Sequence, residues 1–463
     1  MTLNVTRIVA NLFLVGLMVG GCRSLDAPVG WRTDGTGIYG RARAPLQWSD
    51  QENVVWATEM PNWSNSTPII VGDRLFVCSE PTSLVCLRRS DGKILWQRDN
   101  STLELLTATQ AEKLRAELKQ AEPHHKELQE IKEQIRRTER KLKKDPENES
   151  LKKDLQDLQD KKHALEEQLT PLEPHILSGK SHPACGFSTA TPVSDGRNVY
   201  VMFGNSVAAS YDLDGNRQWI NRVDPWIGLH STSPLLVGDK LLVHAAYLVA
   251  LNKTTGEELW RSDAIRRYGT PVHTRIGNVD VIATAYGDLI RVEDGEKLAE
   301  GLGELKYNSP IVQDGTLCYS QGDTRAWKLP AGGTSFKPKL LWHTQIKTHR
   351  YYASPVFHQG LIYSLTIANV LSVIDAENGQ LVYEQNLDLG KGDAFPSLCV
   401  AGGYVFVSNS NGTTRVLKPG RKYESVAMSR LEEFRSSLVF ERNRLYVRGL
   451  KRLYCIAGSR DRN

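Results

Sequence analysis

Aromatic side chains and two arginines recur just ahead of short Ser/Thr-Pro dipeptides in this sequence. They are Trp63, Phe187, His230, Tyr268, Tyr307, Tyr352, Phe395 and Phe434, with Arg350 and Arg435 close by. A ring of such side chains at the mouth of a funnel could stack on a planar ligand or grip an extended peptide. It could equally wedge between neighbouring sheets and seal a channel, and we expect that role for most of them.

The cysteine and histidine residues indicate little metal or redox chemistry. His182 and Cys185 lie close together, but their spacing is not that of a zinc site and no further ligands stand nearby. Cys78 and Cys86 fall on neighbouring strands of one repeat. They fit either a cross-strand disulfide, which needs restrictive geometry, or two buried thiols.

The N-terminus has the pattern of an export signal. Arg7 precedes an apolar run over 8–19, which is shorter than the roughly 20 residues a membrane-spanning helix needs. Val19 to Cys22 resembles a bacterial lipobox, so we predict a signal peptide over 1–21 and a lipid on Cys22. The residue after the cysteine is Arg rather than a retention Asp, which favours the outer membrane, facing the periplasm.

One phrase repeats along the chain: a Ser or Thr, a Pro, an apolar pair, a Gly or Asp turn and a strand. The copies begin at Thr67-Pro68, Thr191-Pro192, Ser233-Pro234, Thr270-Pro271, Ser309-Pro310 and Ser354-Pro355, and Leu replaces Pro at Ser397-Leu398 and Ser437-Leu438. The period of roughly forty residues, with one large gap, is typical of propeller blades.

Each repeat carries four short β-branched or aromatic runs separated by Gly, Asp and Asn turns, which predicts a four-stranded blade. The last repeat has only three strands, and a strand over 52–57 has no partner at the beginning. Pairing these segments removes two sheet edges. We therefore predict an all-β, eight-bladed β-propeller closed by an N-terminal strand, over 48–102 and 178–463, with a tether and leading segment over 22–47.

The gap between the first two repeats, 103–177, predicts a helical coiled-coil hairpin. Gly almost vanishes there, and apolar residues recur at spacings of three and four: Leu128, Ile131, Ile135, Leu142, Leu151, Leu155, Leu158, Leu165 and Leu169. Asp145-Pro146 marks the turn, and a shorter helix from about Leu105 to Ala121 should break before Pro123. The hairpin should rise beside the funnel mouth, as a handle for a partner protein, a lid or a spacer.

These repeats resemble those of the pyrroloquinoline-quinone (PQQ)-type propellers. The shared features are the Ser/Thr-Pro strand, the Asp-Gly or Thr-Gly turn and an outer-strand Trp: Trp56, Trp96, Trp219, Trp260 and Trp342. The leading segment from Trp31 to Gly37 is also similar to bacterial members. The group includes quinoprotein alcohol dehydrogenases and BamB-like envelope lipoproteins, so the resemblance implies the fold more firmly than an activity.

The dehydrogenase pattern is not met. Methanol-oxidising quinoproteins carry adjacent cysteines under the cofactor, whereas no two of the seven cysteines here are adjacent. We also find no clear Asp, Asn and Glu set for calcium. We therefore expect no cofactor and no catalytic residues, with PQQ and calcium as the alternative.

The composition does not indicate nucleic-acid binding, because the 58 basic residues are nearly balanced by 53 acidic ones. We predict a non-enzymatic cell-envelope lipoprotein, a scaffold that binds envelope proteins through the arm at 103–177 and acts in outer-membrane protein assembly. The alternative is a periplasmic PQQ-dependent alcohol or sugar dehydrogenase.

Overall fold

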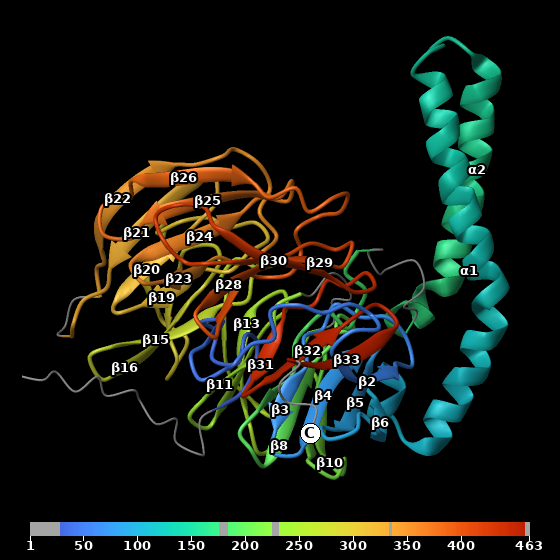
Figure 1. Ribbon diagram of the computed structural model, residues 1–463. Helices are drawn as coiled ribbons and strands as arrows, with labels where there is room; N and C mark the ends of the chain where they lie inside the picture. The colour runs from blue at the N-terminus through green and yellow to red at the C-terminus, as the bar shows by residue number, and fades with distance from the viewer. Residues whose placement is uncertain (1–27, 176–183, 225–230, 333–335, 459–463) are drawn as a thin grey trace, which may run out of the picture.

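The protein is mostly β, with two α-helices that stand outside the sheets (Figure 1). A computed structural model describes residues 28–175, 184–224, 231–332 and 336–458. Over these residues the strands form eight sheets, which we number from 1 to 8 in the order of the repeats.

The first four sheets are meanders of four consecutive strands. Sheet 1 holds β3 (Ile69–Val71), β4 (Arg74–Ser79), β5 (Ser83–Arg88) and β6 (Ile94–Asp99). Sheet 2 holds β7 (Val193–Ser194), β8 (Asn198–Met202), β9 (Val207–Asp212) and β10 (Arg217–Arg222). Sheet 3 holds β11 (Leu235–Val237), β12 (Lys240–His244), β13 (Leu248–Asn252) and β14 (Glu258–Ser262). Sheet 4 holds β15 (Val272–Ile276), β16 (Val279–Ala283), β17 (Leu289–Arg291) and β18 (Lys297–Ala299).

The last two sheets each recruit a strand from the N-terminal region. Sheet 5 holds β19 (Ile311–Gln313), β20 (Thr316–Tyr319), β21 (Asp323–Lys328) and β22 (Lys339–Gln345). Sheet 6 holds β23 (Val356–His358), β24 (Leu361–Leu365), β25 (Val370–Asp375) and β26 (Leu381–Asn386). Sheet 7 holds β27 (Cys399–Ala401), β28 (Tyr404–Ser408), β29 (Thr413–Leu417) and β30 (Ser425–Arg430), and it adds β1 (Ile38–Tyr39). Sheet 8 holds β31 (Val439–Glu441), β32 (Arg444–Arg448) and β33 (Arg452–Ala457), and it adds β2 (Val54–Glu59).

The predicted pairing of the two chain ends is found. Strand β2 runs antiparallel to β33, with Trp56 opposite Cys455 and Thr58 opposite Leu453. Strand β1 was not predicted, and it lies parallel to β27 through Ile38 and Tyr39. Sequence periodicity misses a two-residue strand because it carries too few positions to show an alternation.

Indole hydrogen bonds join the outer strand of one sheet to the neighbouring sheet. Five indole N–H groups donate to a backbone carbonyl of the next sheet over 2.9 to 3.1 Å: Trp56 to Arg89, Trp96 to Leu213, Trp219 to Lys253, Trp260 to Val292 and Trp342 to Ala376. Each ring covers the turn glycine of that next sheet: Gly92, Gly215, Gly256, Gly295 and Gly379. These glycines have positive φ and leave no room for a Cβ under the indole.

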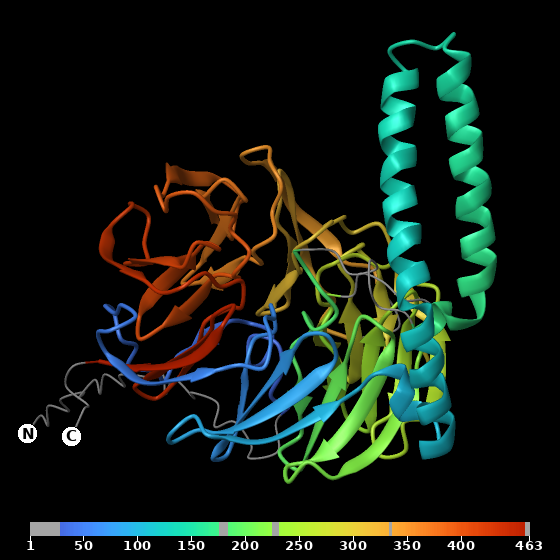
Figure 2. The same ribbon diagram turned by 90° about the vertical axis from the view of Figure 1, so that its right-hand side faces the viewer.

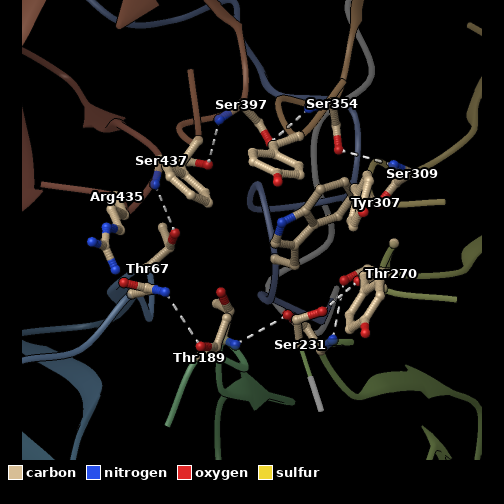
Figure 3. Close-up of a pocket in the computed structure, with 18 of the residues that line it drawn as sticks. Thr67, Thr189, Ser231, Thr270, Tyr307, Ser309, Ser354, Ser397, Arg435 and Ser437 are labelled. Atoms are coloured by element: carbon tan, nitrogen blue, oxygen red, sulfur yellow. Dashed lines mark hydrogen bonds between the residues drawn. The ribbon is translucent and has the colours of Figure 1, made fainter. Parts of the chain in front are cut away.

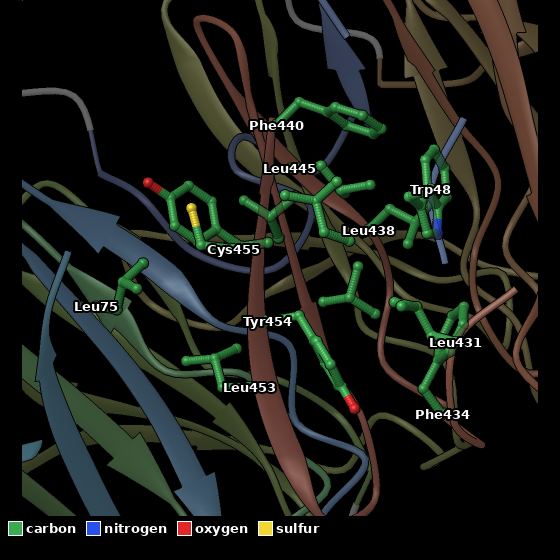
Figure 4. Close-up of a cluster of buried hydrophobic side chains, with 14 of the residues drawn as sticks. Trp48, Leu75, Leu431, Phe434, Leu438, Phe440, Leu445, Leu453, Tyr454 and Cys455 are labelled. Carbon is green, nitrogen blue, oxygen red and sulfur yellow. The ribbon is translucent and has the colours of Figure 1, made fainter. Parts of the chain in front are cut away.

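The apolar core fills the spaces between sheets. Its largest cluster joins sheets 7, 8 and 1 with Trp48, and Figure 4 shows Trp48 among these side chains. The Trp48 ring stacks on Phe406 with centroids 6.4 Å apart. Tyr39 and Ala42 of the leading segment belong to the same cluster, so this described part of the segment packs into the core.

The two helices form a hairpin between sheets 1 and 2, whereas its coiled-coil packing stays a prediction. Helix α1 spans Ala108–Leu142 and α2 spans Glu149–Leu169, flanked by short 3₁₀ turns at Thr102–Leu105 and Thr170–His175. Thr107 and Gln110 form a capping box at the start of α1, and Asn148 caps α2. Figures 1 and 2 show the hairpin standing away from the sheets.

The expected break before Pro123 is wrong, because α1 runs through this proline without interruption. A proline removes one backbone N–H bond from a helix, which usually ends or kinks it. Here apolar side chains on both sides of Pro123 share one cluster with the opposite helix: Leu118, Ala121, Leu128, Leu165, Leu169 and Leu172. This packing holds the helix together across the missing bond.

The base of the hairpin is fixed to sheet 2 by polar contacts. Asn100, fully buried, accepts from the Asn205 amide through its carbonyl and from the Tyr211 hydroxyl through its side chain, both over 2.8 Å. Glu104 pairs with Arg217 at 3.0 Å. The helices therefore leave the propeller from a defined position, and their own apolar cluster contains no propeller residue.

Two further observations bear on the sequence predictions. Cys78 and Cys86 are buried thiols, opposite Leu84 and Phe76 rather than each other, so the disulfide alternative is not adopted. Within the described residues, no helix is both long and apolar enough to cross a bilayer. The signal peptide over 1–21 and Cys22 lie outside the described residues and stay predictions.

The Trp–Gly contact gives a matched test of stability. We expect Gly256→Ala to destabilise the protein by about 1–3 kcal/mol more than Gly238→Ala, because a Cβ at Gly256 would lie 2.6 Å from the Trp219 ring. Gly238 also has positive φ, but nothing lies within 4 Å of its added Cβ. Denaturant unfolding of both variants measures the difference, and equal losses would show that the indole contact contributes nothing.

Candidate functional site

The Ser or Thr that opens each repeat joins neighbouring sheets at their inner ends. In six cases its backbone N–H donates to the hydroxyl of the equivalent residue in the next sheet over 3.0 to 3.2 Å: Thr191 to Ser233, Ser233 to Thr270, Ser309 to Ser354, Ser354 to Ser397, Ser397 to Ser437 and Ser437 to Thr67. The last of these bonds joins sheet 8 to sheet 1. Figure 3 shows six of the residues of this set around one cavity: Thr67, Thr270, Ser309, Ser354, Ser397 and Ser437.

Other contacts join the two remaining pairs of sheets. The Ser66 hydroxyl donates to the Ala190 carbonyl at 3.0 Å between sheets 1 and 2. Between sheets 4 and 5, the Tyr268 N–H donates to the Lys306 carbonyl at 3.1 Å. Gly269 lies so close to Asn308 there that a Cβ would come within 1.9 Å of its carbonyl oxygen.

The cavity enclosed by these residues has a volume of about 330 Å³. All eight opening Ser and Thr residues line it. So do all eight residues two positions before them: Asn65, Thr189, Ser231, Tyr268, Tyr307, Tyr352, Phe395 and Arg435. Residues two apart in an extended chain face the same side, so the strand leading into each sheet presents both to the cavity.

The structure brings six of the ten predicted funnel residues together at this cavity: Tyr268, Tyr307, Arg350, Tyr352, Phe395 and Arg435. Phe434 is buried and is not among the lining residues. Trp63 and Phe187 stand four positions ahead of their repeats and are not among the lining residues; Phe187 is buried and Trp63 lies against Gly186. His230 lies outside the described residues. Ligand binding by these side chains stays a prediction.

Sequence reasoning missed Asn65, Thr189 and Ser231, which take the same place in the first three sheets. A search for aromatic residues passed over these polar ones. A fixed offset of two from the Ser or Thr would have found them, because this offset keeps the side chain on one face of the strand.

The leading segment forms one wall of the cavity. Trp31 lines this cavity and also a second one of about 440 Å³, so its ring lies between the two. Arg32, 1% exposed, donates to the carbonyls of Pro355 and Leu398 over 2.8 and 2.6 Å. Burial lowers the pKa of Arg32 to about 10, so it stays cationic at neutral pH. It thus anchors the segment to sheets 6 and 7.

The chain returning from the hairpin forms another wall. Ala184 and Cys185 line the cavity, and the Ala184 carbonyl accepts from Arg435 at 2.8 Å and from Asn65 at 2.6 Å. The Glu80 carboxylate accepts from the N–H groups of Phe187 and Ser188 over 2.8 and 2.6 Å, which fixes this chain. Burial raises the pKa of Cys185, which disfavours the thiolate that a nucleophile requires.

The lining residues do not fit a quinone with calcium. Calcium takes six to eight oxygen ligands, commonly carboxylates. The cavity offers hydroxyls, one Asn and two Arg but no Asp or Glu, and the described part of the chain contains no group of three His, Cys, Asp or Glu residues arranged for a metal. That no cofactor binds stays a prediction.

Eight repeated sheets whose opening residues surround a central cavity have the architecture of a β-propeller. A family model described as "Outer membrane protein assembly factor BamB" matches residues 39–117, 181–329 and 313–422, and the chain belongs to this family. No curated protein sequence matches the chain.

Solved structures share the fold at low sequence identity. BamB from Moraxella catarrhalis is 11% identical with a TM-score of 0.56, over 89% of this chain and 98% of that one. A europium-containing methanol dehydrogenase is 10% identical with a TM-score of 0.55, over 93% and 91%. Quinohemoprotein alcohol dehydrogenase from Comamonas testosteroni is 9% identical with a TM-score of 0.52, over 87% and 76%. These likenesses concern the fold and not the activity.

The hydroxyl-to-amide contacts predict a specific stability loss. We expect Ser354→Ala to cost about 1–3 kcal/mol of unfolding free energy, because the N–H of Ser309, 1% exposed, loses its acceptor. Ser90→Ala, in an exposed turn, should change stability by less than about 0.5 kcal/mol. Equal effects in denaturant titrations would contradict a role for the hydroxyl.

Proposed function

We propose that this protein is a non-enzymatic scaffold of the cell envelope that binds other envelope proteins during outer-membrane protein assembly. In this proposal Cys22 carries a lipid that anchors the protein in the outer membrane, facing the periplasm. Membership of the BamB family supports the envelope role.

The proposed architecture is a closed ring of eight blades over 48–102 and 178–463, with residues 103–177 as an inserted coiled-coil arm. The strand pairing of β2 with β33 and the Ser437–Thr67 contact support closure. The half-buried seam residues Leu151, Leu155 and Leu158 support coiled-coil packing of α2 on α1.

The hairpin is the observation that carries the proposal. Its helices of 35 and 21 residues project from the sheets (Figure 2), and their apolar cluster includes only residues of the hairpin itself. Beyond that cluster, the outer half keeps its apolar seam half-exposed along two helices. A third helix or a flat apolar surface of a partner would cover this seam.

Removing the arm should remove its partners. We expect replacement of residues 107–171 by a short Gly/Ser linker to abolish capture of at least one envelope protein in a pull-down after cross-linking. The linker is feasible because Thr102 and His175, which flank the deletion, lie in contact at 2.8 Å.

A shortened arm serves as the matched control. Replacing residues 132–161 by a short Gly-rich turn keeps the apolar cluster at the base and removes only the outer half, because the turn spans the about 8–10 Å between packed helices. Loss of the partner in both variants assigns binding to the outer half, and loss in the full deletion alone assigns it to the base. An unchanged partner list in both would contradict the arm as the docking site, and stoichiometric binding of PQQ with dye-linked alcohol oxidation would contradict the scaffold.

The lipid anchor predicts a change of compartment. We expect Cys22→Ala to move the protein from the membrane fraction to the soluble fraction, because the acyl chains provide the membrane affinity. Cys78→Ala, at a buried site in sheet 1, is the control and should stay in the membrane fraction. Continued membrane association of Cys22→Ala would contradict lipidation.

A further inference from the structure

The cavity among the opening Ser and Thr residues is chemically one-sided. Around it, the position two before each opening residue is small and polar in sheets 1 to 3, where Asn65, Thr189 and Ser231 occupy it. In sheets 4 to 7 the same position holds Tyr or Phe, and in sheet 8 it holds Arg435. Side chains that only sealed the space between blades would not need to be divided into a polar side and an aromatic side. A site for a ligand with one apolar and one polar end would need this division.

The aromatic side is a continuous wall. The rings of Tyr268 and Tyr307 stack with centroids 5.5 Å apart, and Tyr307 meets Tyr352 edge to face at 4.6 Å. Tyr352 then stacks on Phe395 at 4.8 Å. Because all four rings also line the cavity, they present flat apolar surface and hydroxyl groups to anything inside it.

Positive charge lies along this wall. The guanidinium carbon of Arg435 lies 5.2 Å from the Phe395 ring centroid, and one of its N–H groups donates to the Ala184 carbonyl. The exposed Arg350 also lines the cavity, beside Tyr352 and Tyr307 in the middle of the wall, and these two tyrosines raise its pKa. Neither arginine forms an ion pair with any described residue, and no Asp or Glu lines the cavity. The cavity therefore has two cations and no carboxylate in its lining, and the described carboxylate that acts on Arg350 is Asp393, which also helps to raise its pKa.

An unsatisfied acceptor lies on the polar side. The Asn65 side chain donates to the Ala184 carbonyl, but its buried Oδ1 has no hydrogen-bond partner among the described residues. A buried amide oxygen without a partner is costly, and a ligand N–H or O–H would satisfy it.

We propose that this cavity binds a carboxylate carried on a flat apolar group, with the carboxylate on Arg435 and Arg350 and the flat group against the wall of Tyr268, Tyr307, Tyr352 and Phe395. A volume of about 330 Å³ is at the small end of ligand cavities and fits a group of the size of one or two amino acids. The ligand is a small aromatic acid or the free C-terminus of a polypeptide. This proposal does not rest on the scaffold role of the arm.

The test compares an acid with its amide on the intact protein. We expect 4-fluorophenylacetate to bind in ¹⁹F NMR titrations and 4-fluorophenylacetamide to bind at least about tenfold more weakly, because only the acid makes charge-assisted hydrogen bonds to arginine. Equal affinities, or no binding of the acid up to millimolar concentration, would overturn the proposal.

Variants of the two arginines locate the site. Arg435→Gln and Arg350→Gln should each weaken binding of the acid about tenfold and leave the weak binding of the amide unchanged. Arg350 is exposed, so its replacement should not disturb the fold even if that of Arg435 does. Arg430→Gln, an exposed arginine outside the cavity lining, is the matched control and should bind like the original protein. Binding that survives both cavity variants would place the acid elsewhere and refute the site.

Two peptides distinguish the sources of the carboxylate. A short peptide ending in Phe is tested with a free and with an amidated C-terminus, in competition with 4-fluorophenylacetate. Displacement by the free peptide alone supports a polypeptide terminus as the ligand. If neither peptide displaces the bound small acid, the ligand is a small acid. Displacement by both peptides equally would refute carboxylate recognition.

Discussion

The structure depends on a backbone N–H at the inner end of one sheet finding a hydroxyl in the next. Proline after the Ser or Thr holds the preceding residue extended and removes a competing donor, which leaves that N–H directed sideways. Where Leu398 replaces the proline, its own N–H donates to the Ser354 carbonyl. This additional hydrogen bond joins sheets 6 and 7 in place of the conformational restriction that proline would provide. At the outer edge the indole N–H groups also join each sheet to a backbone carbonyl of the next. One example is Trp219, whose ring covers Gly256.

The consequence for the site is geometric. Each sheet needs a small hydroxyl residue at its inner end. The residue two positions earlier can be of any type, but its side chain always points into the cavity. Tyr307 and Thr189 occupy equivalent positions and differ completely in character. The scaffold therefore tolerates any chemistry at the cavity, which is consistent with the range of activities among proteins of this fold.

Much of the fold was predictable from the sequence, because the repeat encodes it locally. The spacing of the Ser/Thr-Pro phrases and the lone strand around Trp56 were enough to predict the β2–β33 pairing. The continuity of α1 through Pro123 was not, because it depends on leucines from the opposite helix. Trp31 in the cavity wall was also beyond prediction, since nothing local to residues 28–37 shows where a nonrepetitive segment will pack. The missed cavity residues followed from searching by residue type rather than by strand position.

The way Arg32 and β2 are held has a kinetic consequence. The hydrogen bonds of Arg32 span 323 and 366 residues of chain, and β2 pairs with a strand at the far end of the sequence. Contacts of this separation form late, since the entropy of closing so long a loop has to be overcome before they stabilise anything. During synthesis the apolar residues of the N-terminal segment therefore stay exposed until sheets 6 to 8 have folded. The wall of the central cavity and the closure of the last sheet then form in the same final step of folding.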